Sequence, residues 1–235
     1  MPSNRFYTDY ELKRGSSVSI EGPEHHHLVH VMRLGKGEEV ELVNGRGFLG
    51  LGTLAEVNKK SASIQILSST FQEDSKPRIC LAIPLMRSSK IEWIVEKGTE
   101  LGAHAFLFYG AKYSEKEDFS SRQLERLHLL SIAALKQSGR LYLPSIEILP
   151  GLNNIFIQEA LFLFGDPRSE SPIMPMIAGI KPSTIVFISG PERGFSEEEL
   201  TVLNAKSKGV RLNAHILRAE TAPIAAASIL GMVFI

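Results

Sequence analysis

The sequence predicts an α/β protein with two domains, a small antiparallel β-barrel over residues 1–72 and a parallel α/β domain over residues 73–235. Three observations predict this fold class. Short segments before residue 70 alternate apolar and polar side chains, as half-buried strands do. From residue 78 onward, apolar runs alternate with helical patterns, which is typical of a parallel sheet. The polar, proline-ended segment Glu73–Pro77 separates the two patterns, and we expect it to be a linker.

Strand patterns mark four segments of the first domain. They are Ser17–Ile20, Glu39–Val43, Phe48–Val57 and Ala62–Leu67. The pair Asn44 and Gly45 separates the second segment from the third, and both residue types tolerate a positive backbone φ. The pair therefore predicts a two-residue type I′ hairpin turn.

Apolar runs predict the strands of the second domain. They are Arg78–Leu85, Ala105–Tyr109, Ala160–Phe164, Ile185–Ser189 and Val210–Leu217. The runs are nearly continuous rather than alternating, as expected of strands that are buried on both faces.

Capping boxes, in which a serine is followed three residues later by Glu or Gln, predict where three helices of the second domain begin. The pairs are Ser89 with Glu92, Ser120 with Gln123, and Ser196 with Glu199. Gly139 is expected to end the second of these helices, because glycine favours the residue after a helix. A last helix is predicted to begin near Thr221 and Pro223, since proline fits the first turn of a helix.

Composition places the chain among neutral globular proteins. Its 26 Lys+Arg balance 26 Asp+Glu, and 43% of its residues are hydrophobic, which excludes a disordered chain. The apolar stretch Ile224–Ile235 is too short to span a membrane, and residues 1–10 lack the apolar core of a secretory signal. The single cysteine, Cys80, excludes an intrachain disulfide and a thiolate zinc site. We therefore expect a cytoplasmic protein with no membrane partner.

Two turns at the expected carboxyl edge of the parallel sheet are candidate ligand sites, because open α/β sheets bind ligands there. Gly190–Gly194 lies between a strand and a capped helix, and its glycines allow close backbone approach; a plain tight turn is the alternative. Arg218 and Glu220 lie in the second turn, Leu212–Ala222, where a solvated ion pair is the alternative. The glycine spacing fits neither a dinucleotide fingerprint nor a P-loop, so a phosphate cradle is not expected.

Five motifs follow one another along the chain. They are Arg5–Tyr7, His25–Gly35, Glu96–Gly102, Gln137–Arg140, and the pair Ser189–Glu199 with Ile216–Pro223. Together they resemble the motifs of the RsmE family, which are 16S ribosomal RNA (uracil-N3)-methyltransferases of the SPOUT superfamily. The sequence departs from the usual family residues at Arg193, Asn213, His215 and Lys136. These departures affect the expected cofactor contacts more than the expected reaction class.

The resemblance implies a PUA-like RNA-binding domain at the N-terminus and a SPOUT domain with a deep trefoil knot at the C-terminus. In that superfamily the knot holds S-adenosylmethionine in a bent shape, and the active site lies at a homodimer interface. The residues that the resemblance implies for cofactor binding are Phe164, Gly165, Ser189, Gly190, Pro191, Glu192, Gly194, Leu212, Asn213, Ile216, Leu217, Thr221 and Ala222.

The implied reaction is methyl transfer from S-adenosylmethionine to N3 of a specific uridine in 16S rRNA, with free rRNA or the assembled small subunit as the partner. Arg218 is expected to stabilise the negative charge left when N3 loses its proton, and Glu220 to orient Arg218 or to accept that proton. A sulfonium is already an activated leaving group, so no metal is expected. The residues expected to bind the RNA substrate are Arg5, His26, Arg33, Lys97, Gln137 and Arg140.

Two alternatives to this function stay open. One is a SPOUT methyltransferase that acts on ribose O2′, and the other is a non-catalytic RNA-binding factor of ribosome assembly. The balanced charge also predicts weak affinity for arbitrary RNA, because a neutral protein has no long-range field to attract phosphates. A metal held by His26 and His30 is disfavoured, since no cysteine ligand lies near them in the sequence.

Overall fold

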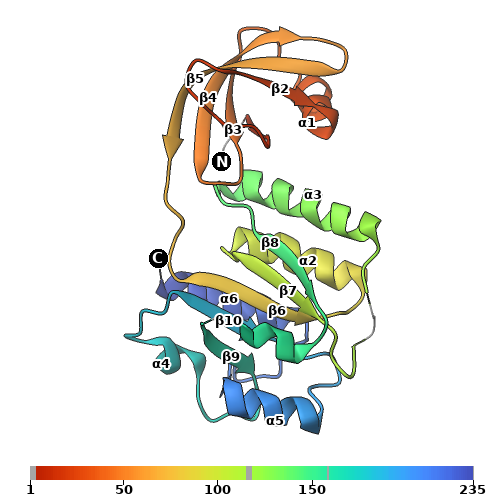
Figure 1. The fold of residues 1–235 in the computed structure, drawn as a ribbon, viewed down its shortest axis with the longest axis vertical. Helices are drawn as coiled ribbons and strands as arrows, with labels where there is room; N and C mark the ends of the chain where they lie inside the picture. Colours follow the sequence, from red (N-terminus) through yellow and green to blue (C-terminus); the bar gives the residue numbers. More distant parts are fainter. Residues whose placement is uncertain (1–3, 115–117, 158, 235) are drawn as a thin grey trace. The chain divides into compact units, whose positions relative to one another are not determined.

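The computed structural model describes residues 4–114, 118–157 and 159–234 (Figure 1). The chain divides into two compact units. The first unit comprises Met1–Asp74 with Ile132–Leu143, and the second unit comprises Ser75–Ser131 with Pro144–Ile235. A functional domain boundary between residues 72 and 73 stays a prediction.

Among the described residues, the first unit has a five-stranded sheet in the order β1-β3-β4-β5-β2. The strands are β1 (Arg5–Tyr7), β2 (Ser17–Glu21), β3 (Glu39–Val43), β4 (Phe48–Val57) and β5 (Ser61–Phe71). The four predicted strands are confirmed, and alternate side chains such as Val18, Leu42 and Ile64 are buried in one core. Strand β1 pairs in parallel with β3, and it is too short to show a period in the sequence.

The histidine-rich segment after β2 is helical, which the sequence patterns missed. Helix α1 (Gly22–His26) continues into a π-helical turn, η1 (His27–Val31), whose Leu28 is buried in the core of the first unit. Arg33 follows in the left-handed region with φ +57°, and the Leu34 N–H donates to the Leu28 carbonyl at 3.1 Å. Each helical stretch is too short for a 3.6-residue period to show in the sequence.

The hairpin predicted at Asn44 and Gly45 is confirmed, because β3 and β4 pair antiparallel, but its turn is not of type I′. Val43 pairs with Leu49, so the connection is wider than two residues. The Asn44 Oδ1 accepts a hydrogen bond from the Arg46 N–H at 3.0 Å, which favours this wider loop. The loop also pairs with residues 141–143, because the Leu143 N–H donates to Gly45 and the Gly47 N–H donates to the Leu141 carbonyl. A tight turn would not reach these partners.

Within the described residues, the second unit has a six-stranded sheet in the order β11-β9-β10-β6-β7-β8, and every pairing is parallel. The strands are β6 (Arg78–Pro84), β7 (Ala105–Tyr109), β8 (Ser145–Leu149), β9 (Leu161–Gly165), β10 (Thr184–Ile188) and β11 (Lys208–Val210). The predicted parallel sheet is confirmed. Strand β8 was not predicted because it is an edge strand with three exposed positions, and so it lacks a continuous apolar run.

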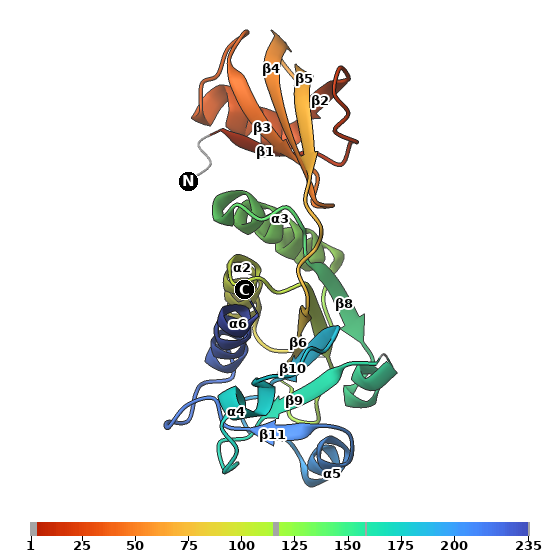
Figure 2. The ribbon, with the colours of Figure 1, turned by 90° about the vertical axis from the view of Figure 1, so that its left-hand side faces the viewer.

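Helices cover both faces of this sheet (Figure 2). The helical segments from residue 88 onward are α2 (Ser88–Glu100), α3 (Ser121–Ser138), the 3-10 turn η2 (Leu152–Ile157), α4 (Ile173–Ile177), α5 (Glu197–Lys206) and α6 (Thr221–Val233). On one face, Ile91 of α2 and Leu230 of α6 are buried in the same cluster as alternate strand residues. On the other face, Leu203 of α5 and Ile155 of η2 complete a second cluster.

Two of the three predicted capping boxes are confirmed, at Ser120 and Ser196, where each serine exchanges hydrogen bonds with the residue three positions on. The box predicted at Ser89 is wrong, because the residue that caps the start of α2 is Arg87, two positions earlier in the chain. The Glu92 carboxylate does not reach back to the helix start but pairs with Arg126 at 2.7 Å. The glycine end of α3 is confirmed, since Gly139 follows it with φ +84°.

The strand predicted over Val210–Leu217 is also wrong. Strand β11 ends at Val210, which pairs with Gly165, and residues 212–220 form a loop that leads into α6. The Asn213 Oδ1 accepts a hydrogen bond from the His215 N–H at 3.0 Å, and Ile216 is 82% exposed. The apolar residues of this segment line a pocket instead of extending the sheet. No helix in the described ranges is long and apolar enough to cross a membrane.

Candidate active site

A pocket of about 750 Å³ lies in the second unit, where β9, β10 and β11 end. Its walls are the segments that follow these strands, so it occupies the carboxyl edge of the parallel sheet, where such sheets bind ligands. All but one of the residues implied for cofactor binding or catalysis line this pocket. They are Phe164, Gly165, Ser189, Gly190, Pro191, Glu192, Gly194, Leu212, Asn213, Ile216, Leu217, Arg218, Glu220 and Ala222.

Thr221 is the exception, because it forms the start of a helix and not a wall of the pocket. It begins α6, and the N–H groups of Thr221 and Ala222 donate to the Arg218 carbonyl at 2.9 and 3.0 Å. These bonds fix the backbone of Arg218 at the start of the helix, while its side chain is exposed at the pocket. The roles expected of these residues stay predictions.

The turn after β10 is anchored from several directions. The Ser189 N–H and Oγ both donate to the Ala82 carbonyl, and the buried Tyr109 hydroxyl donates to the Ser189 carbonyl at 2.7 Å. Burial raises the pKa of Tyr109 well above its ordinary value, so the phenol stays a neutral donor. A side chain at Gly190 would approach the Phe195 ring to 3.0 Å, which explains glycine there. The wall of the pocket formed by this turn is therefore rigid.

Lys90 is a pocket residue that the sequence patterns missed. It lies in the first turn of α2, and its Nζ donates to Glu192 at 2.6 Å and lies 3.5 Å from Glu220. The hydrogen bond to Glu192 raises the pKa of Lys90. Burial alone would raise the pKa of Glu192, but the bond from Lys90 and a backbone N–H lower it below its ordinary value. The described contacts of Glu220 thus include an ion pair with Lys90, and its expected contact with Arg218 stays a prediction.

Arg193, one of the departures from the family pattern, lines the pocket and lies over the Tyr113 ring at 5.1 Å. A cation held over an aromatic face gains favourable electrostatic energy. The arginine therefore has a partner outside the turn, and the turn keeps the glycine it needs, since Gly194 has φ +78°.

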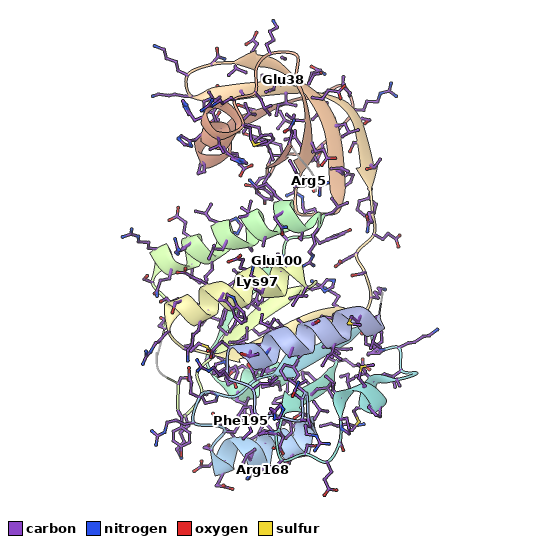
Figure 3. All side chains as sticks on the ribbon, turned by 180° about the vertical axis from the view of Figure 1, so that it is seen from behind. Arg5, Glu38, Lys97, Glu100, Arg168 and Phe195 are labelled. Atoms are coloured by element: carbon purple, nitrogen blue, oxygen red, sulfur yellow. The ribbon has the colours of Figure 1, made fainter. Side chains whose placement is uncertain are left out.

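The residues expected to bind RNA are divided between the two units. Lys97 belongs to the second unit and forms ion pairs at 2.8 Å with Glu96 and with Glu100 on the same helix, α2 (Figure 3). The other five residues, Arg5, His26, Arg33, Gln137 and Arg140, belong to the first unit. Among these, His26, Arg33 and Gln137 are exposed.

Arg5 and Arg140 are much less accessible. The Arg5 side chain is 8% exposed and pairs with Glu41 at 2.8 Å, while its Nη1 is buried with no hydrogen-bond partner among the described residues. Burial lowers the pKa of Arg140 to about 10. Both arginines are thus built into the first unit as well as being candidates for RNA contact. The His26 and His30 rings pack at a tilt of 43° with their centroids 4.9 Å apart, and the described residues contain no group of three potential metal ligands.

The chain matches families and proteins of known class. Residues 73–231 match the RNA methyltransferase domain family, and residues 20–67 match the RNA methyltransferase PUA domain family. The chain is 30% identical to Ribosomal RNA small subunit methyltransferase E of Bacillus subtilis, over 94% of this chain and 92% of that protein. The corresponding protein of Rickettsia conorii is 28% identical, over 96% of this chain and 94% of that protein.

Solved structures agree with these matches. A Ribosomal RNA small subunit methyltransferase E from Neisseria gonorrhoeae, bound to S-adenosyl methionine, has a TM-score of 0.89 at 26% identity, over 100% of this chain and 98% of that chain. A methyltransferase from Legionella pneumophila, in complex with the bound cofactor SAM, has a TM-score of 0.87 at 25% identity, over 97% and 96% of the two chains. The predicted PUA-like and α/β fold is confirmed. The chain belongs to the ribosomal RNA small subunit methyltransferase E family of RNA methyltransferases.

Proposed function

We propose that the protein transfers a methyl group from S-adenosylmethionine to N3 of a specific uridine in 16S rRNA, as a cytoplasmic homodimer whose C-terminal loops form a trefoil knot. The observation that carries this proposal is the single pocket made by the ends of β9, β10 and β11 in a chain of this family. Relatives solved with S-adenosylmethionine support the cofactor, and the PUA family match supports an RNA substrate.

The residues present fit this cofactor. The pocket of about 750 Å³ falls within the range that holds a ligand of this size. Leu212 and Leu217 supply apolar surface for a base, while Glu192 and Glu220 supply negative charge that suits a cationic ligand. Gly165 and Gly190 leave backbone accessible at the wall. When bound, S-adenosylmethionine supplies a methyl group on sulfur that is already activated for transfer.

The chain's own residues have two tasks in this reaction. N3 of uracil carries a proton, and it attacks the methyl carbon with the electron pair left when that proton departs. The N–C bond forms as the C–S bond breaks, with the C–S electrons remaining on sulfur. Glu220 accepts the N3 proton, and Arg218 stabilises the negative charge that spreads onto the uracil oxygens. Both residues line the same pocket, which supports a shared role at one nucleobase.

The first experiment is a calorimetric titration of the purified protein with S-adenosylmethionine. Saturable one-site binding is expected, and no detectable binding would rule out both enzymatic functions in favour of the RNA-binding assembly factor. The second experiment compares reverse transcription of rRNA from wild-type and gene-deletion cells. A methyl on N3 blocks base pairing and stops extension, so the stop should vanish on deletion. A ribose O2′-methyltransferase would leave this stop unchanged.

A further inference from the structure

Lys90 joins two acidic walls of the pocket that come from distant parts of the chain. Glu192 lies in the turn after β10, Glu220 immediately precedes α6, and Lys90 projects from the first turn of α2. The Lys90 Nζ lies 2.6 Å from the Glu192 Oε1 and 3.5 Å from the Glu220 Oε2. All three side chains are largely shielded, with 26%, 27% and 17% of their surfaces exposed for Lys90, Glu192 and Glu220. The ammonium group is therefore shared between two carboxylates at the site.

The two contacts of Lys90 are of different types. The contact with Glu192 is a short charge-assisted hydrogen bond, which fixes the position of the ammonium group. The contact with Glu220 is an ion pair, because the Glu220 Oε2 is buried without a hydrogen-bond donor among the described residues. This oxygen is thus held beside a positive charge with no described donor bonded to it. Because the Oε2 is buried, a bound base can meet only the other oxygen of the carboxylate, and the ion pair with Lys90 fixes the orientation in which that oxygen is presented.

The charge balance around Glu220 depends on Lys90. Lys90 faces it from α2, Glu192 from the turn after β10, and Arg218 and His215 line the same pocket from the loop before α6. Glu192 carries the same charge as Glu220, so the two carboxylates repel each other. Lys90 lies within ion-pair distance of both carboxylates. Without it, two shielded negative groups would share one pocket.

We propose that Lys90 is a positioning residue that holds the Glu220 carboxylate in the orientation from which it accepts the N3 proton, with Glu192 anchoring Lys90. This inference rests on the proposed function for the identity of the proton donor. Its physical part, the dependence of the Glu220 side-chain position on Lys90, is independent of any substrate.

The physical part is tested by carbon NMR on the full chain labelled with glutamate carrying ¹³C at Cδ. The resonance of Glu220 is assigned by its loss in Glu220→Gln, and its chemical shift and line width at neutral pH are compared between wild type and Lys90→Met. We expect the resonance to move in Lys90→Met, because the carboxylate loses the charge that orients it. The matched control is Lys112→Met, which removes the exposed Lys112–Glu198 pair outside the pocket and should leave the Glu220 resonance unchanged. An unchanged Glu220 resonance in Lys90→Met would overturn the proposal.

The functional part is tested by methylation kinetics on small subunits from the deletion strain. In Lys90→Met, we expect kcat to fall about tenfold or more, because the proton acceptor is no longer held in place. The affinity for S-adenosylmethionine should change much less, and Lys90→Arg should restore most of kcat. A loss confined to the affinity for the cofactor, with kcat unchanged, would contradict a role through Glu220. If the wild-type protein methylates nothing, the proposed function fails. If the wild-type protein is active and the Lys90 variants are equally active, only this inference fails.

Discussion

The polar residues of the second unit converge, whereas those of the first unit are divided between the surface and the interior. In the second unit, segments following two different strands, β10 and β11, bring Glu192, Arg218 and Glu220 into one pocket. In the first unit, Arg33 is exposed, but Arg5 is nearly buried in an ion pair with Glu41. A family motif therefore identifies a chemical site where strand ends meet at a pocket. Elsewhere the same kind of motif can mark a residue that holds the fold together.

The largest expected effect is at the pocket of the second unit, where the polar residues converge. Arg218→Ala should lower kcat for methylation by about 10²–10³, because it removes a charge aimed at the negative charge that develops on uracil. Binding of S-adenosylmethionine, measured by calorimetry, should change little. The control is Arg126→Ala, which removes an arginine that is 62% exposed and pairs with Glu92 on α2. Near-normal turnover in Arg218→Ala would remove this residue from the chemistry.

The next largest expected effect tests whether Arg5 stabilises the folded protein. Arg5→Met should lower the free energy of unfolding by about 2–3 kcal/mol, since it strands a partly buried Glu41 without its partner. Urea denaturation measures this change. Lys13→Met breaks the exposed pair with Glu11 and should have no resolvable effect. If Arg5→Met keeps full stability but loses RNA affinity, Arg5 is a surface contact and the contrast between the units is weaker.

A smaller effect separates stability from function at Arg33. Its φ of +57° is costly for a side chain with a Cβ, so Arg33→Gly should stabilise the protein by about 0.5 kcal/mol. The same change should reduce RNA binding and lower its salt dependence by about one phosphate contact. Arg14→Gly, at an exposed position without positive φ, should not stabilise the protein. A loss of stability in Arg33→Gly would show that the arginine side chain makes a contact that offsets its backbone strain.

The smallest expected effect is on the stability of the protein at acid pH. Because the folded-state pKa of Glu192 is lowered, its ionised form stabilises the protein above the ordinary pKa of a carboxyl group, and that stabilisation is lost as pH falls through the folded-state pKa. Glu192→Gln should therefore make the decline of stability between about pH 5 and pH 3 shallower. Thermal unfolding at a series of pH values measures the slope. An equal slope in both proteins would mean that Lys90 contributes no net stabilisation to ionised Glu192.

The sequence predicted those elements whose cause is local. The capping box at Ser196 and the glycine after α3 depend on residues within one turn of helix, and both are present. The apolar run after Val210 was predicted to be a strand because its residue types favour strands, but in the folded protein these residues line a pocket. Strand β8 and Lys90 were missed for a related reason: what defines them is a partner far away in the chain.

The position of α6 in the chain has a consequence for synthesis. Strand β6 lies at the centre of the second sheet, yet Ala226, Ala227 and Leu230 of α6 belong to the same buried cluster as Ile79, Leu81 and Ile83. This cluster cannot close until the ribosome has made residue 230, long after β6 has emerged. Contacts so distant in sequence form slowly, and the central strand meanwhile exposes apolar side chains. Chaperones are therefore expected to bind nascent chains that contain β6 but lack α6, and to release them once α6 docks.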